Sequence, residues 1–381
     1  MSKIPIWRDS RFIKIVGQGI VLAIVITAIA YFGNNLVNNF QRLNLTFGYN
    51  FLSRPASFGI ANPPISYRPT DPYLRALFVG VLNSLRIMFF GIIFASIIGI
   101  GVGIGRLSDN WLVRKLAGIY VEVLRNTPLL LQLFFWYFAV FLRLPQIDNP
   151  LIVGNILFLT NRGLDVRWYQ PNIRTGLALL TIVGFIILAI ASWIKRIKAI
   201  ERGNSPKLWF WLMGVSAIAI LLLFCFSIDW VIPQLENRRI EGGLNLSPEF
   251  ATLLIGLSIY TAAFIAEVVR AGIQSVSKGQ WEASKALGFK PSIAMQLIIF
   301  PQALRVIIPP LTSEFLNLAK NSSLAIAIGY SDLYAIGNTI SNQTGKSVEI
   351  LLIIMTVYLT INLIISAIMN RFNGLMQKNF S

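Results

Sequence analysis

Long apolar runs separated by shorter polar stretches recur along the whole chain. A membrane-spanning helix needs about 20 mostly apolar residues, and the runs reach that length at eight places. They lie at roughly 12–33, 79–105, 117–142, 175–193, 208–228, 250–270, 303–328 and 348–369. Backbone groups in hydrocarbon must be hydrogen-bonded, and no barrel-like alternation is visible, so each run predicts a helix. We therefore expect an all-α integral membrane protein with about eight transmembrane helices, the first of them retained rather than cleaved.

The composition is that of a membrane protein, and it excludes several kinds of functional site. Hydrophobic residues make up 55% of the 381 residues and charged residues 13%, whereas soluble domains carry about 25% charge. The chain has no His and one Cys, Cys225, which excludes imidazole catalysis and an intramolecular disulfide. The segment QTGKS at 343–347 ends like a phosphate loop, but Ile340 stands where that loop needs Gly. We expect no metal and no ATP hydrolysis in this chain.

The positive charge is distributed unevenly between the two sides of the predicted spans. Lys and Arg number 33 against 16 Asp and Glu, a net charge of +17. A short loop at 194–207 carries Lys195, Arg196, Lys198, Arg202 and Lys207. The loops on this side hold most of the basic residues, so the positive-inside rule places both termini in the cytoplasm. The charge then indicates topology and attraction to membrane lipid rather than nucleic-acid binding.

One predicted cytoplasmic loop, residues 278–301, has the pattern of a short helix with an apolar face. Ala283, Ala286 and Leu287 recur at helical spacing. Gly288 permits a left-handed turn that would end this helix. A second short helix is expected from Lys290-Pro291, and Pro301 is expected to close the segment. The loop is either a surface that lies on lipid headgroups or a compact knob that fits a socket on another protein.

The same loop resembles a motif of a known family. Glu282, Ala283, Ser284, Gly288, Ile298 and Pro301 are spaced as in the EAA loop of ABC importer permeases, with Ser in place of the second Ala. The segments 260–283 and 120–135 are similar to the polar amino-acid branch of that family. The resemblance covers roughly 75–142 and 248–372, and the extra length is similar to the long subunit of general L-amino-acid and glutamate/glutamine/aspartate importers.

The resemblance implies a fold, a function and a set of partners. It implies a type I importer permease core and a chain in the bacterial inner membrane that imports polar, acidic or neutral, L-amino acids. The implied partners are two ATP-binding subunits that carry ATP and Mg²⁺, a periplasmic amino-acid-binding protein and a second permease, with a heterodimer favoured over a homodimer. It also implies a coupling loop that the ATP-binding subunits grip. The implied coupling residues are Glu282, Ala283, Ser284, Leu287, Gly288 and Pro301.

Polar and charged residues inside the spans suggest a path for substrate, because such residues are costly in lipid. A zwitterion needs a cation for its carboxylate and carbonyls or an acid for its ammonium group. The candidate path residues are Glu122, Arg125, Thr127, Gln132, Tyr260, Glu267, Asn317, Lys320, Ser322 and Ser323. Glu122, Arg125 and Gln132 would share one helix face. Glu122 could instead pair with Arg125, and Glu267 with Arg270.

These elements predict a division of the chain into five parts. The parts are an N-terminal helix and extracytoplasmic loop (1–74), the first permease segment (75–142), an inserted loop with two extra helices (143–247), the second permease segment (248–372) and a cytoplasmic tail (373–381). The alternative function is an ion-coupled secondary transporter. It would need a proton relay, for which the chain has no His and few acids within spans.

Overall fold

The computed structural model describes residues 10–42, 46–154, 156–201, 205, 207–236 and 239–379. Its twelve α-helices among these residues are α1 (Ser10–Arg42), α2 (Tyr73–Gly105), α3 (Trp111–Asn126), α4 (Leu129–Phe134), α5 (Ile173–Glu201), α6 (Lys207–Phe226), α7 (Pro248–Gln274), α8 (Lys278–Ala286), α9 (Pro291–Ala294), α10 (Phe300–Asn321), α11 (Leu333–Thr344) and α12 (Ser347–Asn379). Shorter helical turns follow α4 (Phe135–Val140, Phe141–Arg143), α9 (Met295–Ile299) and α10 (Ser322–Ile328), and one at Asn50–Ser53 precedes α2. The predicted helical fold class is confirmed.

The membrane-spanning pattern also agrees with the expectation. Seven of the described helical segments are long and apolar enough to cross a bilayer, and the bent pair α3–α4 would make eight. The pair turns by 106° at Thr127-Pro128, so the third expected span is a broken helix and not a straight one. Proline lacks the N–H that a continuing helix needs and disfavours the helical region for the residue before it.

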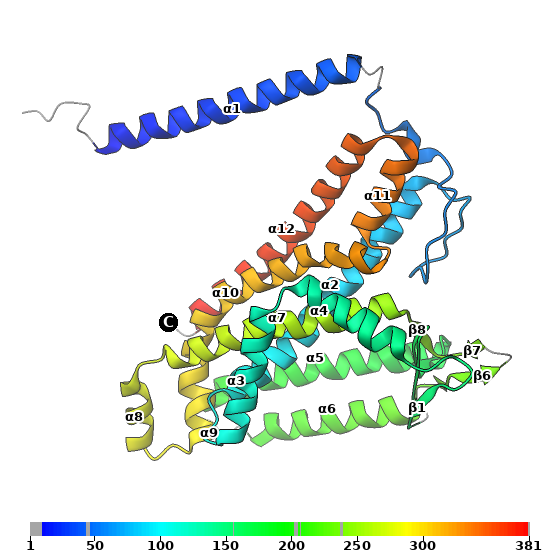
Figure 1. Cartoon of the computed structure of the whole chain (residues 1–381). Helices are drawn as coiled ribbons and strands as arrows, with labels where there is room; N and C mark the ends of the chain where they lie inside the picture. Colours follow the sequence, from blue (N-terminus) through cyan, green and yellow to red (C-terminus); the bar gives the residue numbers. More distant parts are fainter. Residues whose placement is uncertain are drawn as a thin grey trace, which may run out of the picture.

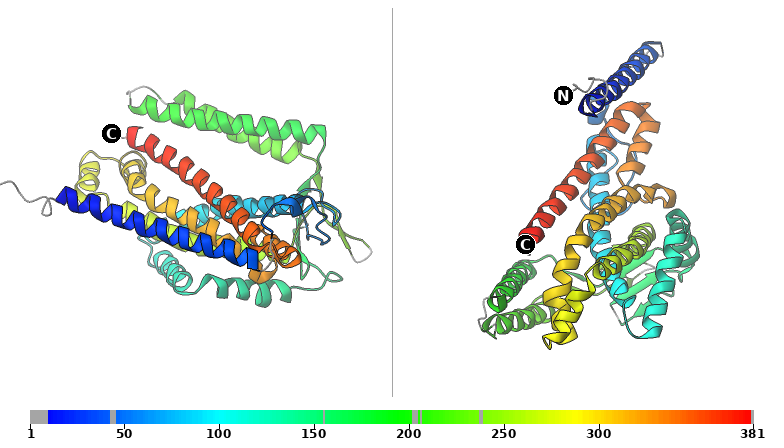
Figure 2. Two further views of the ribbon diagram at one scale, coloured as in Figure 1. Left: turned by 90° about the horizontal axis from the view of Figure 1, so that it is seen from above. Right: turned by 90° about the vertical axis from the view of Figure 1, so that its left-hand side faces the viewer.

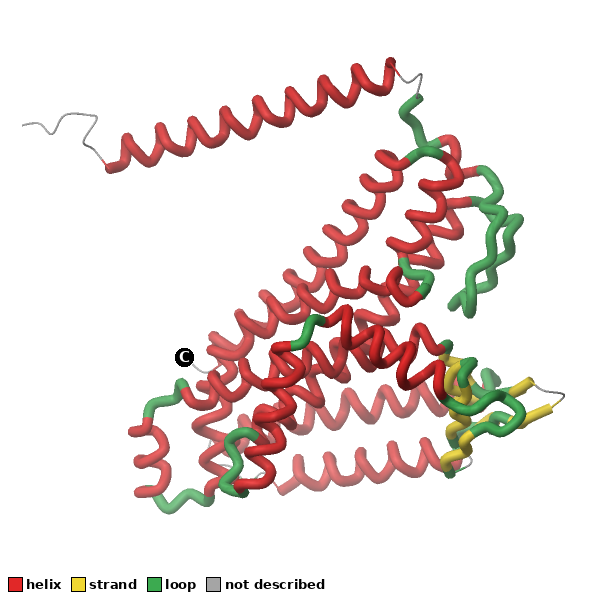
Figure 3. The backbone as a smooth tube through the Cα atoms, in the orientation of Figure 1, coloured by secondary structure: helices red, strands yellow, loops and turns green. Residues whose placement is uncertain are grey.

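Short strands at one end of the molecule were not expected from the sequence. They are β1 (Leu151–Val153), β2 (Leu157–Thr160), β3 (Gly163–Val166), β4 (Trp168–Tyr169), β5 (Trp230–Val231), β6 (Gln234–Glu236), β7 (Arg239–Glu241) and β8 (Leu244–Leu246). An antiparallel sheet has the order β1-β2-β3-β8, and two-stranded sheets join β4 to β5 and β6 to β7. All of them belong to the 143–247 insert and gather at the end opposite α8 (Figure 3).

The centre of the bundle is the crossing of α2 and α7. A stripe of glycines in α2 serves this contact: a Cβ on Gly99 would lie 2.7 Å from the Cβ of Ile265, and one on Gly103 would lie 2.8 Å from the carbonyl oxygen of Ala266. Glycine is needed here because any larger side chain would push the two helices apart. The α5–α6 hairpin lies on one side of α7 and the α3–α4 pair on the other (Figure 2).

The ends of the central helices are defined by local signals. Ser247 precedes α7, and its Oγ accepts a hydrogen bond from the Phe250 N–H at 3.2 Å. Such a cap satisfies one of the free N–H groups at a helix start. As a result α7 starts beside β8 and ends beside α8, at opposite ends of the molecule (Figure 1). Helix α7 therefore connects the two ends of the protein.

Candidate functional site

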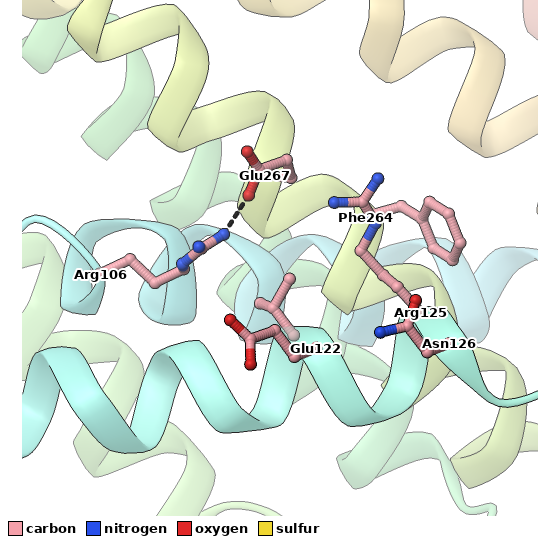
Figure 4. A pocket seen from close by; sticks show the side chains of 7 residues that line it. Arg106, Glu122, Arg125, Asn126, Phe264 and Glu267 are labelled. Carbon is pink, nitrogen blue, oxygen red and sulfur yellow. Dashed lines mark hydrogen bonds and ion pairs between the residues drawn. The ribbon is translucent and has the colours of Figure 1, made fainter.

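A charged pocket of about 320 Å³ lies where α2, α3 and α7 meet. It is lined by Arg106, Val121, Glu122, Arg125, Asn126, Phe264 and Glu267 (Figure 4). Of the predicted path residues, the structure brings Glu122, Arg125 and Glu267 together here. Tyr260 lies one turn from Phe264 on α7, with ring centroids 5.0 Å apart.

Glu267 is the charge centre of this pocket. It accepts hydrogen bonds from Arg106, at the end of α2, and from Arg270, whose Nε lies 3.2 Å from Glu267 Oε1. The alternative pairing of Glu267 with Arg270 is therefore present, whereas Glu122 and Arg125 form no ion pair with each other among the described residues. Arg106 is not among the predicted path residues, and only the fold shows its part in the pocket.

Arg125 remains available to a ligand from α3. Its guanidinium carbon lies 5.2 Å from the centroid of the Phe264 ring, a cation–π distance. Arg125 also lies within electrostatic range of Glu314 on α10. The Tyr120 hydroxyl donates to the Ile259 carbonyl at 2.7 Å, which holds α3 against α7. The pocket thus offers both signs of charge on a fixed frame, as a zwitterion would require.

The break between α3 and α4 gives Thr127 and Gln132 structural contacts. Thr127 Oγ1 donates to the Val123 carbonyl at 2.7 Å. The Gln132 amide donates to the carbonyls of Leu124 and Thr127 at 2.9 and 3.0 Å. Because the chain bends between them, Gln132 does not share a helix face with Glu122 and Arg125. It is 6% exposed and satisfies the carbonyls that the break leaves free.

The remaining predicted path residues belong to α10 and the turn that follows it. Asn317 and Lys320 are exposed on α10 in the isolated chain. Ser322 is buried and Ser323 is not, and their hydroxyls donate to the carbonyls of Ala319 and Lys320 at 2.8 Å. None of these four residues lines the pocket described above.

The predicted coupling loop forms a projecting helix at the end opposite the strands (Figure 1). Gly288 has φ +73°, and the N–H groups of Gly288 and Phe289 donate to the carbonyls of Lys285 and Ser284 at 2.9 and 3.1 Å. This pair of hydrogen bonds is a Schellman stop, which needs a left-handed residue. The expected turn at Gly288 is confirmed.

One side of α8 packs against the bundle, and the other side is exposed. Ser284 is 2% exposed, and Trp281 packs against the main hydrophobic cluster of the bundle. Ala283 and Leu287 are exposed, Leu287 at 72%. The α8 apolar face, defined here as Ala283, Ala286 and Leu287, is therefore open.

Pro301 does not close the coupling segment, contrary to the expectation. It lies in the first turn of α10, which continues without interruption from α9 through the π-helical stretch Met295–Ile299. Proline is tolerated in a first helical turn because its missing N–H has no partner there. The second helix of the loop is thus the beginning of a long membrane helix.

Comparisons with known proteins fit this geometry. The family described as "Binding-protein-dependent transport system inner membrane component" matches residues 244–378. The general L-amino acid transport system permease protein AapQ of Rhizobium johnstonii is 42% identical over 97% of this chain and 93% of its own length. The chain belongs to the amino-acid permeases of ABC transporters. The putative amino-acid ABC transporter permease YhdX of Escherichia coli K12 is 41% identical, over 93% of this chain and 92% of its own. BztB of Rhodobacter capsulatus, a glutamate/glutamine/aspartate/asparagine transport system permease, is 37% identical over 96% and 94%.

Membership of this family settles the class of function. The permease is a non-catalytic, multi-pass inner-membrane subunit that forms a translocation path for amino acids in an importer. ATP-binding subunits and a binding protein are its partners. The matched relatives are permeases of ATP-driven systems, and nothing in the comparisons favours the ion-coupled alternative.

Proposed function

We propose that this permease imports polar, acidic and neutral, L-amino acids and receives the energy of ATP hydrolysis through the α8 apolar face. The observation that carries the coupling role is a small apolar surface that the chain itself does not cover. Burying a leucine side chain completely is worth about 1.5–3 kcal/mol, and Leu287 is 72% exposed. Ser284 and Trp281 hold α8 against the bundle, so a partner that grips Leu287 moves the bundle with it.

Glu282, Ala283, Leu287 and Gly288 form the proposed contact with the ATP-binding subunits, which carry ATP and Mg²⁺. Ser284 takes part by holding α8 against the bundle, where it is 2% exposed. Gly288 fixes the angle at which α8 ends, and Ala283 lets a partner approach closely. Pro301 takes part only indirectly, because it lies in α10 beyond the exposed loop. A contact between Gln302 Nε2 and Gln280 Oε1 at 3.3 Å supports a mechanical link from α8 to α10.

The substrate assignment follows from the charges of the pocket and from the relatives. General L-amino acids and glutamate, glutamine, aspartate and asparagine stand in the names of two relatives. In this proposal Arg125 receives a carboxylate and Glu122 an ammonium group. Glu267 lines the same pocket, and Tyr260 lies beside it against the Phe264 ring. Asn317, Lys320, Ser322 and Ser323 continue the path along α10, and Thr127 and Gln132 shape the bend beside it.

A second permease subunit is proposed because polar and charged side chains within a span are open to the surroundings. Lys320 and Asn317 are exposed on a helix that crosses the membrane. Charges in hydrocarbon are costly and face protein or water instead. A homologous second permease would cover them. A heterodimer is favoured over a homodimer, as the resemblance of this chain to the long subunits of such importers implies.

The proposed orientation puts α8 and both termini in the cytoplasm. Helix α1 begins, and α12 ends, toward the end of the molecule where α8 lies (Figure 1). The strands of the 143–247 insert then face the outside. The division into parts at 74, 142, 247 and 372 stays a proposal: 247 directly precedes α7, whereas 74 lies within α2 and 372 within α12.

The test is purification of the assembled importer in mild detergent, followed by uptake of the twenty amino acids in proteoliposomes containing ATP. We expect the ATP-binding subunits to co-purify and polar L-amino acids to be taken up. Leu287→Asp should reduce both co-purification and uptake at least tenfold. Lys285→Asp, which places the same side chain on another side of α8, should leave both nearly unchanged. Uptake without nucleotide, or full uptake by Leu287→Asp, contradicts the proposal.

A further inference from the structure

Arg86 is a charged residue in the middle of a membrane helix. It lies 13 residues after the start of α2, which is about 20 Å along a helix. Its guanidinium carbon lies 4.7 Å from the centroid of the Phe250 ring at the start of α7. Among the described residues Arg86 forms no ion pair. A charge placed this way within a span faces the interior and marks a functional site by default.

The surroundings of Arg86 are held rigidly by hydrogen bonds between α2 and the turn before α11. Asn83 Nδ2 donates to the Ser331 carbonyl at 2.8 Å, and Ser84 Oγ accepts from the Leu333 N–H at 3.1 Å. The guanidinium of Arg86 packs over the Phe250 ring, whose centroid lies 5.9 Å from that of the Tyr330 ring in the same turn. The guanidinium is therefore positioned before any ligand arrives, which lowers the entropic cost of binding.

The acids nearest in the chain to these surroundings accept hydrogen bonds from other groups. Asp332 accepts hydrogen bonds from the Ala335 N–H at 2.8 Å and from the Tyr358 hydroxyl at 3.1 Å. Glu249 accepts from the Tyr137 hydroxyl at 3.0 Å. A guanidinium has five donors in a planar fork that matches a carboxylate. No carboxylate among the described residues forms an ion pair with Arg86, so its donors can bind the carboxylate of a ligand.

We propose that Arg86 binds the α-carboxylate of the amino acid in the outer half of the path, before the substrate reaches Arg125. The position follows from Phe250, which lies in the first turn of α7, the end beside β8, whereas the pocket with Arg125 is lined by Phe264 and Glu267, later on the same helix. Helix α7 runs from β8 toward α8 (Figure 1). This inference rests on the proposed function, because it assigns a residue to the same path. Arg86 acts by binding and orienting substrate and takes part in no chemical step.

The experiment measures binding of radiolabelled L-glutamine to the complex of the permeases and ATP-binding subunits in nanodiscs, without the binding protein. L-glutaminamide, which lacks the α-carboxylate, serves as competitor. We expect Arg86→Gln to weaken binding about tenfold, the scale for loss of a charged hydrogen bond. Arg86→Lys, which keeps the charge but not the planar fork, should weaken binding less than Arg86→Gln does. L-glutaminamide should compete poorly with L-glutamine for binding to the wild-type complex.

The matched control is Arg75→Gln on the same helix. Arg75 lies near the start of α2, 3.4 Å from Asp71, with a side chain 42% exposed, and this change should leave binding unaltered. Binding of Arg86→Gln equal to wild type overturns the inference. The inference is also overturned if both Arg86 variants lose the same affinity for L-glutamine and melt at a lower temperature, because this result indicates that Arg86 serves packing. Wild type that takes up L-glutamine but does not bind it in nanodiscs overturns the inference alone. Wild type that neither binds nor takes up any polar amino acid overturns the proposed function as well.

Discussion

Replacing Gly99 by Ala should destabilise the permease although the change adds only one methyl group. The new Cβ would lie 2.7 Å from two atoms of Ile265 and 3.0 Å from the Ala262 carbonyl oxygen. Carbon atoms in contact normally lie about 3.5–4.0 Å apart, so α2 and α7 must separate by nearly 1 Å. Overpacking of this kind costs about 1–3 kcal/mol. Gly101 is the matched control, because a Cβ there would have no neighbour within 4 Å.

The assay is unfolding of both variants in mild detergent, followed by size-exclusion chromatography after heating and by titration with a denaturing detergent. We expect Gly99→Ala to unfold at a lower temperature than wild type, whereas Gly101→Ala should unfold at the same temperature or higher, since Ala favours a helix over Gly by about 0.5–1 kcal/mol. Uptake should fall with Gly99→Ala, because Arg106 and Glu267 lie at the end of the same interface. Equal stability of the two variants would refute the close packing of α2 on α7.

Two further changes test the coupling loop and a buried acid. Gly288→Val should leave membrane insertion and ATPase activity in place but reduce uptake severalfold. The left-handed conformation costs a non-glycine residue about 1–2 kcal/mol, so the substitution changes how α8 ends. The control is Gly279→Val, which should transport normally because Gly279 has no positive φ and a Cβ there would have no neighbour within 4 Å. Burial raises the pKa of the Asp332 carboxyl, which lies between two spans, to about 6. An unfolded Asp has a pKa near about 4, so the folded state binds more protons between these values, and stability should fall as pH rises from about 4 to 6 and then stay level. Asp332→Asn keeps an acceptor for the Ala335 N–H and should remove this loss of stability, so that the variant is more stable than wild type at pH 7.5 by roughly 1–3 kcal/mol. Thermal unfolding measured across this pH range tests the prediction. A variant with the same pH profile as wild type would show that Asp332 does not cause the pH dependence.

The membrane helices could be predicted because the bilayer imposes one length on all of them. The expected run at 250–270 corresponds to α7 at Pro248–Gln274, and the run at 348–369 to α12 at Ser347–Asn379. The strands could not be predicted in the same way. Each is only two to four residues long, and their pairing depends on contacts such as Leu164 with Leu246, which no local pattern announces.

The candidate site was predicted in part, and its errors have a common cause. Helical periodicity placed Gln132 on one face with Glu122, but that argument holds only along an unbroken helix, and the chain bends at Thr127-Pro128. Arg106 carries no local signal either, because its partner Glu267 lies 161 residues away. The stop at Gly288, in contrast, depends only on residues within one turn of it, and this local prediction was confirmed.

The arrangement of helices suggests how motion at α8 reaches the pocket. Helix α8 follows α7 after three residues, and α7 is held to α2 by the contacts of Gly99 and by the ion pair of Glu267 with Arg106. A pull on α8 therefore moves two of the three helices that line the pocket as one body. The third, α3, contacts α7 through the hydroxyl of Tyr120 and turns sharply where α4 begins. Opening and closing of the pocket then requires movement of α3 against the α2–α7 pair, and the exposed charges of α3 are the ones that such a movement would present to a passing amino acid.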